Sequence, residues 1–230
     1  MKKEWWAHRS VDSSGRVVEV LVGTHQVALV IEFDSNGEIM SGLYRPEKGL
    51  LVSVDPRVPK PQELYRDVAY YRFCDFLGWQ GVAPVFPWQL EPGDKGVIRP
   101  YWKVIKNMEI YHFGKKKLDG GDRLFWRRLA LADYIFGVGD RVSNDFLITQ
   151  DGTQVVDSGF SFLPELNFPY QQSIIRDLYR GDSVDDSLLT DLERLRQDFD
   201  PNYVDGLIGE IELYWVWERV RRIRSEKTFC

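Results

Sequence analysis

GVGDRVSNDFLITQDGTQVVDSGFSF, residues 137–162, carries the strongest structural signal in the chain. An apolar triplet at 146–148 and a β-branched pair at 155–156 flank the turn QDGT at 150–153. Asp-Gly between two apolar runs is a strong signal for a β-hairpin. Because a hairpin places the ends of its two strands side by side, we expect the polar residues that flank this one to converge. These residues are Asp140, Asn144, Asp145 and Asp157.

The oxygen atoms of these four side chains suit a hard divalent cation. Mg²⁺ takes oxygen ligands in octahedral geometry and usually keeps several waters and substrate phosphates. Solvated loop carboxylates are the alternative, since aspartate is common in turns. The order of the residues favours the metal: Asp140, a second candidate ligand five positions on, a hairpin, and then Asp157-Ser158-Gly159. This order is the layout of a kinase active site.

With these residues the sequence resembles the phosphatidylinositol 3- and 4-kinases, which carry Gly-Asp-Arg-His…Asn followed by Asp-Phe-Gly. It resembles more closely the small bacterial kinase-like proteins related to them, whose signatures are Tyr-Lys-Pro, Asp-Arg and Asp-His-Gly. The HipA-type kinases are more distant. The resemblance spans residues 17–162 and is most specific at 137–162, whereas the residues after 162 match only in being helical.

The resemblance implies an α+β, two-lobed protein-kinase-like fold. Residues 1–100 would form a small, mostly antiparallel β N-lobe with one helix, and residues 101–230 a larger helical C-lobe. β-rich or short apolar runs favour strands at 16–22, 27–33, 39–44, 82–88 and 96–102. Helical spacing is present at 62–77, 124–136, 173–179, 188–199 and 204–224. We expect residues 173–230 to form the base of the C-lobe, with a separate partner-binding bundle as the alternative.

By the same resemblance, the loop residues take distinct roles in phosphoryl transfer. Asp157 would hold Mg²⁺ against the nucleotide phosphates, and Asp145 fills the position of the second metal ligand. Asn144 lies one position short of it and is the competing candidate. Asp140 would orient the acceptor hydroxyl or take its proton. The lipid kinases carry a His two residues later, where this chain has Val142.

The residues expected to contact the nucleotide lie upstream. Thr24 and His25 stand in a loop between the first two strands, where backbone N–H groups would cover the phosphates. An ordinary hairpin turn is an equal alternative for this loop. The segment from Ile98 to Tyr101 leads into the link between the lobes, and we expect adenine to lie against it.

Arg45 stands where the family has a lysine, in the sequence Tyr44-Arg45-Pro46. That lysine contacts the nucleotide phosphates and pairs with a helix carboxylate, and arginine and lysine are not interchangeable. Asp67 aligns with the family's glutamate, so a longer cation faces a shorter acid and their combined reach is kept. We therefore predict a compensating Arg45–Asp67 pair, with two unrelated surface changes as the alternative.

Bulk properties exclude several classes of function. A formal net charge of −5 argues against non-specific nucleic-acid binding. Cys74 and Cys230 form neither a metal-binding spacing nor a disulfide framework. No run approaches the about 18–20 apolar residues of a membrane span, and the N-terminal residues do not resemble a signal peptide. We expect a soluble, cytoplasmic protein.

Together these features predict an ATP-dependent kinase that uses Mg²⁺ or Mn²⁺. It would transfer the γ-phosphoryl group to a hydroxyl on a protein or a small molecule. The alternative is a nucleotide-binding or non-catalytic pseudokinase that acts as an interaction module. The three carboxylates favour catalysis, whereas Arg45 and the missing histidine favour the pseudokinase. A lipid acceptor is less favoured, because the chain is small and acidic and has no accessory membrane domain.

Overall fold

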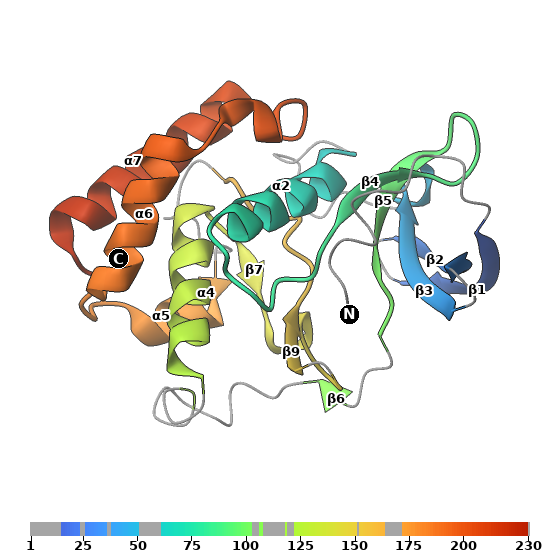
Figure 1. The fold of residues 1–230 in the computed structure, drawn as a ribbon, viewed down its shortest axis with the longest axis horizontal. Coiled ribbons are helices and arrows are strands. Elements are labelled where there is room, and N and C mark those ends of the chain that lie inside the picture. Colours follow the sequence, from blue (N-terminus) through green and yellow to red (C-terminus); the bar gives the residue numbers. More distant parts are fainter. Residues whose placement is uncertain are drawn as a thin grey trace.

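The computed structural model describes residues 15–23, 26–35, 38–50, 61–102, 106–107, 118, 122–150, 152–163 and 172–229. A small antiparallel sheet forms one part of the molecule and a group of helices forms the larger part, with one further helix lying between them (Figure 1). This is the predicted α+β, two-lobed arrangement. The predicted boundary between residues 100 and 101 coincides with the end of a strand, and it stays a prediction as a domain limit.

The sheet of the small lobe has five strands: β1 (Arg16–Val22), β2 (Val27–Ser35), β3 (Glu38–Pro46), β4 (Phe86–Gln89) and β5 (Lys95–Pro100). Their order across the sheet is β1-β2-β3-β5-β4, and every neighbouring pair is antiparallel. The fourth strand is shorter than the predicted 82–88. Its first residues leave the sheet, because Val82 instead forms a bridge with Val155 of the larger lobe.

Side chains alternate between the two faces of this sheet. We call the face that carries Leu43 and Arg45 the inner face, and the one that carries Tyr44 the outer face. Directly paired residues share a face, so Val97 lies with Arg45 and Ile98 lies with Tyr44. The outer face closes over a small core of its own, formed by Ile31, Phe33, Tyr44 and Ile98.

The helix between the lobes is α2 (Gln62–Phe76), and it belongs to the main hydrophobic core. Phe73 stacks against Phe136 and Phe199 of the larger lobe, with ring centroids 4.8 and 4.4 Å apart. The helix ends at Phe76, and Gly78 follows with a φ of 68°, a left-handed conformation that glycine adopts without steric cost. α2 also packs against the sheet, where Tyr71 lies edge-on to Phe86 of β4 with ring centroids 5.5 Å apart, so it joins the two lobes.

Two small sheets and three short 3₁₀ helices are also present among the described residues. The sheets are β7 (Asp140–Arg141) with β10 (Gln172–Ser173), and β6 (Lys106–Asn107) with β8 (Phe146–Thr149) and β9 (Gly152–Val155). The 3₁₀ helices are η1 (Glu47–Gly49), η3 (Ser143–Asp145) and η4 (Pro201–Val204). β8 and β9 are antiparallel, with Thr149 opposite Gly152, which confirms the predicted hairpin.

In the described part of the chain, the larger lobe contains the four helices α4 (Arg123–Ile135), α5 (Ile174–Tyr179), α6 (Asp186–Asp198) and α7 (Glu210–Glu226). The first three follow the predicted ranges closely. The fourth does not extend over the predicted 204–224, because Gly206 takes a left-handed φ of 70° and interrupts the run. Asp200 instead caps η4 by accepting a hydrogen bond from the Asn202 N–H at 2.9 Å.

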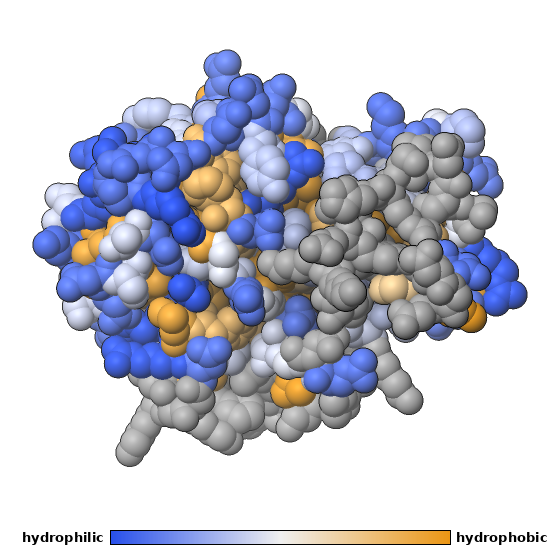
Figure 2. Space-filling view, viewed as in Figure 1, coloured by the Kyte–Doolittle hydropathy of each residue, from blue (hydrophilic) through white to orange (hydrophobic). Residues whose placement is uncertain are grey.

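The surface over the helices of the larger lobe is largely hydrophilic, with hydrophobic residues showing between them (Figure 2). Among the helices that the structure describes, none combines the length and the apolar character that crossing a bilayer requires.

Candidate functional site

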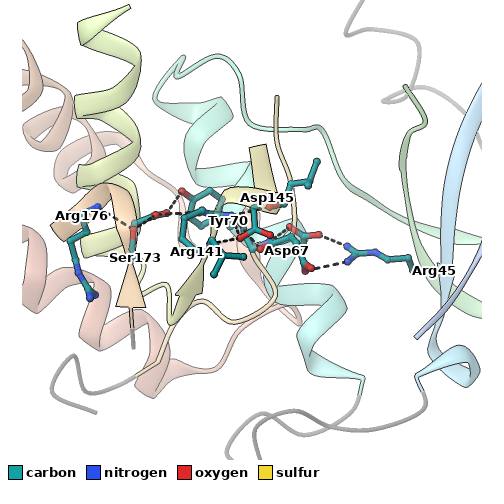
Figure 3. A network of polar contacts seen from close by, with 12 residues as sticks. Arg45, Asp67, Tyr70, Arg141, Asp145, Ser173 and Arg176 are labelled. Atoms are coloured by element: carbon teal, nitrogen blue, oxygen red, sulfur yellow. Dashed lines mark hydrogen bonds and ion pairs between the residues drawn. The ribbon is translucent and has the colours of Figure 1, made fainter. Parts of the chain in front are cut away.

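Arg45 and Asp67 form a buried ion pair between β3 and α2, as the sequence predicted. The second oxygen of Asp67 accepts a hydrogen bond from the Ser158 backbone N–H at 3.0 Å. Arg45 also lies 3.8 Å from the carboxylate of Asp157. The pair therefore joins the inner face of the sheet, α2 and the Asp157-Ser158-Gly159 loop at one place, which Figure 3 shows from close by.

The loop itself holds an unusual backbone conformation. Asp157 has a φ of 59°, a left-handed value that aspartate tolerates but that costs about 1–3 kcal/mol in general. Its side chain is half exposed. Gly159 follows, and a Cβ there would lie 2.6 Å from Cγ of Glu63 and 3.0 Å from its carbonyl oxygen. Only glycine lets this loop approach the first turn of α2 so closely, so the Asp-x-Gly spacing has a steric reason.

Arg141 fixes the loop from the opposite side. Its fully buried guanidinium donates to the carbonyl oxygens of Val156 and Asp157 at 2.9 and 3.2 Å, and to Oγ of Ser158 at 2.9 Å. It also donates to the carboxylate of Asp133 at 3.2 and 3.3 Å. These contacts give Arg141 a structural role. With its hydrogen-bonding groups so engaged, the guanidinium is not open to a ligand.

Asp133 is the centre of a polar network that the sequence analysis missed. It lies fully buried on α4 and accepts hydrogen bonds from the Tyr70 hydroxyl at 2.8 Å and the Ser173 hydroxyl at 2.6 Å. Ser173 in turn caps α5 by accepting from the Arg176 N–H at 3.1 Å. The network thus links α2, α4, α5 and the Arg141 loop (Figure 3). In the sequence, the one sign of this network is that Asp133 is an acidic residue within an apolar helical run.

Asp145 and Asn144 occupy different environments. Asp145 is buried, and its Oδ2 accepts a hydrogen bond from the Val142 N–H at 2.8 Å and lies 3.9 Å from Arg141. Its Oδ1 has no hydrogen-bond partner among the residues described. Asn144 is exposed. Asp145 therefore caps its own turn and still has one carboxylate oxygen for a ligand.

Asp140 lies exposed at the edge of this acidic cluster. Desolvation by the surrounding protein and the charges of Asp157 and Asp145 raise the pKa of Asp140 to about 8. Desolvation likewise raises the pKa of Asp145 to about 7, with Asp157 adding to the shift and Arg141 opposing it. The three carboxylates repel one another, which is the electrostatic condition that a cation relieves.

In the described part of the chain, no three His, Cys, Asp or Glu side chains gather closely enough to surround one metal ion. Mg²⁺ does not require such a cage, because it commonly binds through one or two carboxylates together with waters and substrate phosphates. Asp145 and Asp157 match that donor set. The residues present therefore fit a metal ion that arrives with a nucleotide better than one that resides in the protein alone.

Two apolar clusters lie next to the charged residues. Ala28, Val30 and Leu43 cover the inner face of the sheet, with Leu43 two residues before Arg45. In the larger lobe Ala83, Trp102 and Val156 pack together, with Val156 directly before Asp157. Each cluster thus contains a residue within two positions of a charged residue of the site along the chain.

The contact of adenine with the segment from Ile98 to Tyr101 stays a prediction, and the structure shows where these residues lie. The Ile98 side chain packs in the outer-face core, away from Arg45, because it is paired with Tyr44. The Tyr101 N–H donates to the Ser41 carbonyl at 3.0 Å and is not free for a base. The next backbone donor along the chain is that of Trp102. Thr24 and His25 lie outside the described residues.

Comparison with known proteins identifies the class of fold. No protein-family model and no curated protein sequence matches the chain. Among solved structures 286 chains match it, and they include the crystal structure of the Helicobacter pylori proinflammatory kinase CtkA. That match has a TM-score of 0.55 at 13% identity, and it covers 95% of this chain and 94% of the other. The chain therefore has a two-lobed, protein-kinase-like fold.

Proposed function

We propose that this chain is an atypical kinase that uses ATP with Mg²⁺ or Mn²⁺ and transfers the γ-phosphoryl group to a hydroxyl. The observation that carries the proposal is the assembly of Arg45, Asp67 and the Asp157 loop at one place. A cation on β3, a carboxylate on the neighbouring helix and a metal-binding Asp before a glycine are the parts that position phosphates in kinases. The kinship to the phosphatidylinositol 3- and 4-kinases rests on the motifs of residues 137–162.

The residues would have the following roles. The adenine base would lie between the Leu43 and Val156 clusters, and Asp157 and Asp145 would hold the metal ion. That ion supplies charge neutralisation at the phosphates. Asp140 is exposed, as a group must be that meets an acceptor from solution, and it would orient the acceptor hydroxyl. Its position favours a protein or small-molecule acceptor that approaches from outside.

The alternative is a pseudokinase, and one observation favours it. Arg45 already contacts two carboxylates, so it is less available to phosphates than a free lysine. A nucleotide-binding protein without transfer activity would keep the same fold and act as an interaction module. A cytoplasmic location is part of the proposal in both cases.

Incubation with labelled ATP and Mg²⁺ tests the proposal by hydrolysis, autophosphorylation and calorimetric binding. Asp140→Asn should remove activity while retaining nucleotide binding, and Asp157→Asn should reduce both. Asp145→Ala should weaken metal-dependent binding more than Asn144→Ala, because a carboxylate holds Mg²⁺ more strongly than an exposed amide. Asp198→Asn, at an exposed position on α6, is the matched control.

The outcomes separate the two candidates. Binding of MgATP without hydrolysis or transfer would support the pseudokinase. No binding at millimolar nucleotide, by calorimetry and by thermal shift, would exclude both. If Asn144→Ala weakens metal-dependent binding more than Asp145→Ala does, the second metal ligand is Asn144.

A further inference from the structure

Arg99 is a second arginine on the inner face of the sheet. It pairs with Leu43 across β5 and β3, whereas Arg45 pairs with Val97 two residues earlier on β5. Paired residues share a face, so the two arginines are diagonal neighbours, which in antiparallel sheets means Cα atoms about 7–8 Å apart. Arg99 also directly precedes Pro100 and the link between the lobes.

The two arginines differ in what neutralises them. Arg45 has an ion pair with Asp67 and a second with Asp157. Arg99 is partly buried, and within the described ranges no hydrogen bond or ion pair holds its guanidinium. Desolvation and the nearby charge of Arg45 lower the pKa of Arg99 to about 10, and Asp67 and Asp157 offset this only in part. Arg99 is still fully cationic at neutral pH.

Several buried arginines of the chain differ from Arg99, because each of them has a carboxylate partner. Arg66 pairs with Glu212, Arg127 with Asp182 and Asp185, and Arg141 with Asp133. A desolvated cation without such a partner is unfavourable. Its presence beside the Asp157 loop indicates that the partner is an anion supplied by a ligand.

We propose that Arg99 is the cation that binds the phosphates of the nucleotide, while Arg45 holds Asp67 and Asp157 in place. The inference rests on the proposed function and deepens it. In this arrangement the two tasks of the family's single lysine are divided between two arginines. A guanidinium can donate two parallel hydrogen bonds to one phosphate, so the ligand chemistry that fits is a nucleoside di- or triphosphate.

The proposal predicts that a change at Arg99 affects thermal stability and phosphate affinity in opposite directions. Replacing Arg99 by methionine removes a desolvated charge and keeps the unbranched apolar chain. The ligand-free protein should therefore melt at the same temperature as the wild type or higher. Phosphate binding should fall at the same time, so that stability and affinity change in opposite directions. A residue with a merely structural role would lower both.

The experiment compares the full-length wild type with Arg99→Met and Arg99→Lys, by calorimetry and thermal melting. Arg221→Met is the control, since Arg221 is exposed on α7 and pairs with Glu218. The probes are MgATP, adenosine, and inorganic tripolyphosphate with Mg²⁺. Arg99→Met should weaken binding of MgATP and tripolyphosphate by about tenfold to a hundredfold, as expected for a lost charge-assisted hydrogen bond. Adenosine binding should be unchanged, and Arg99→Lys should be intermediate.

Each outcome decides a different point. If Arg99→Met binds MgATP as the wild type does, the inference on Arg99 is wrong and the proposed function stands. If the wild type binds no MgATP, no adenosine and no tripolyphosphate, both are wrong. If tripolyphosphate alone binds and needs Arg99, the phosphate role holds and the kinase proposal fails. A lower melting temperature together with weaker adenosine binding would make Arg99 a structural residue and overturn the inference.

Discussion

At the scale of single residues, the Arg45–Asp67 pair brings a long cation and a short acid together. The arginine is long enough to contact Asp67 on α2 and to approach Asp157 on the loop. The shorter aspartate also accepts the Ser158 N–H. Arginine can serve two carboxylates because its donors are arranged as a planar fork, whereas a lysine is a point charge.

Exchange of both residues tests the predicted compensation. Arg45→Lys should weaken MgATP binding, because the shorter ammonium reaches Asp67 poorly and loses Asp157. Adding Asp67→Glu should recover much of the affinity. A double-mutant cycle on nucleotide binding measures the coupling, which for residues in contact is about 0.5–3 kcal/mol. A coupling energy of zero would mean that the two positions act independently.

At the scale of the elements, several polar contacts hold α2 to the larger lobe. Arg66 pairs with Glu212 of α7 and donates to the Ser161 carbonyl at 3.0 Å. Tyr70 bonds Asp133 of α4, and directly after the helix Trp79 donates to Asp191 of α6 at 2.7 Å. The carboxylate that pairs with Arg45 is therefore held on a fixed helix.

Loss of the link to α7 should be costly. Arg66→Met leaves Glu212 without its buried partner, and breaking such a pair from one side costs about 3–5 kcal/mol. Arg222→Met is the control, because Arg222 pairs with Glu226 on the exposed face of α7, where ion pairs contribute about 0–1 kcal/mol. Urea denaturation measures both free energies of unfolding. Equal values for the two variants would show that the link to α7 does not hold α2.

At the scale of the whole molecule, the acidic cluster makes stability depend on pH. The folded-state pKa values of Asp140 and Asp145, about 8 and about 7, lie above the ordinary value of 3.8. The native state therefore holds more protons than the unfolded state between these values, and the free energy of unfolding falls as pH rises. The stabilisation is complete below the ordinary pKa and is lost as pH passes through 7 and 8.

Thermal melting of the metal-free protein tests whether stability falls as pH rises. The melting temperature should fall from about pH 5.5 to about pH 8.5, since both carboxylates lose their protons over that range. The Asp140→Asn, Asp145→Asn double variant should show a flatter dependence, because it cannot build up the repulsion. Saturating Mg²⁺ with ATP should raise the melting temperature most at the alkaline end. A double variant with the slope of the wild type would assign the pH dependence to other groups.

The likeness to a solved kinase at 13% identity shows that the pattern of the chain, rather than its individual residues, carries the fold. Local patterns were sufficient for the hairpin after residue 145, for the first three strands and for α2. Each depends on turn residues and on apolar spacing within a few positions. The β3–α2 ion pair was predicted through the resemblance to the kinases, in which a cation on this strand pairs with a carboxylate on the next helix.

The remaining features depend on which elements pack together, and no local pattern contains that information. In the sequence, Asp133 is an ordinary position in an apolar helix. The structure shows that Tyr70, Arg141 and Ser173 all donate hydrogen bonds to it. The sequence does not show which face of the sheet carries the Ile98 side chain. The pairing of Ile98 with Tyr44 decides this, and it places both on the outer face. The sequence by itself determined the strands, the hairpin and the order of the acidic residues, since these follow from neighbouring side chains. Only the tertiary structure decided how most buried charges are neutralised, because partners such as Arg66 and Glu212, or Arg127 and Asp185, lie far apart in the chain.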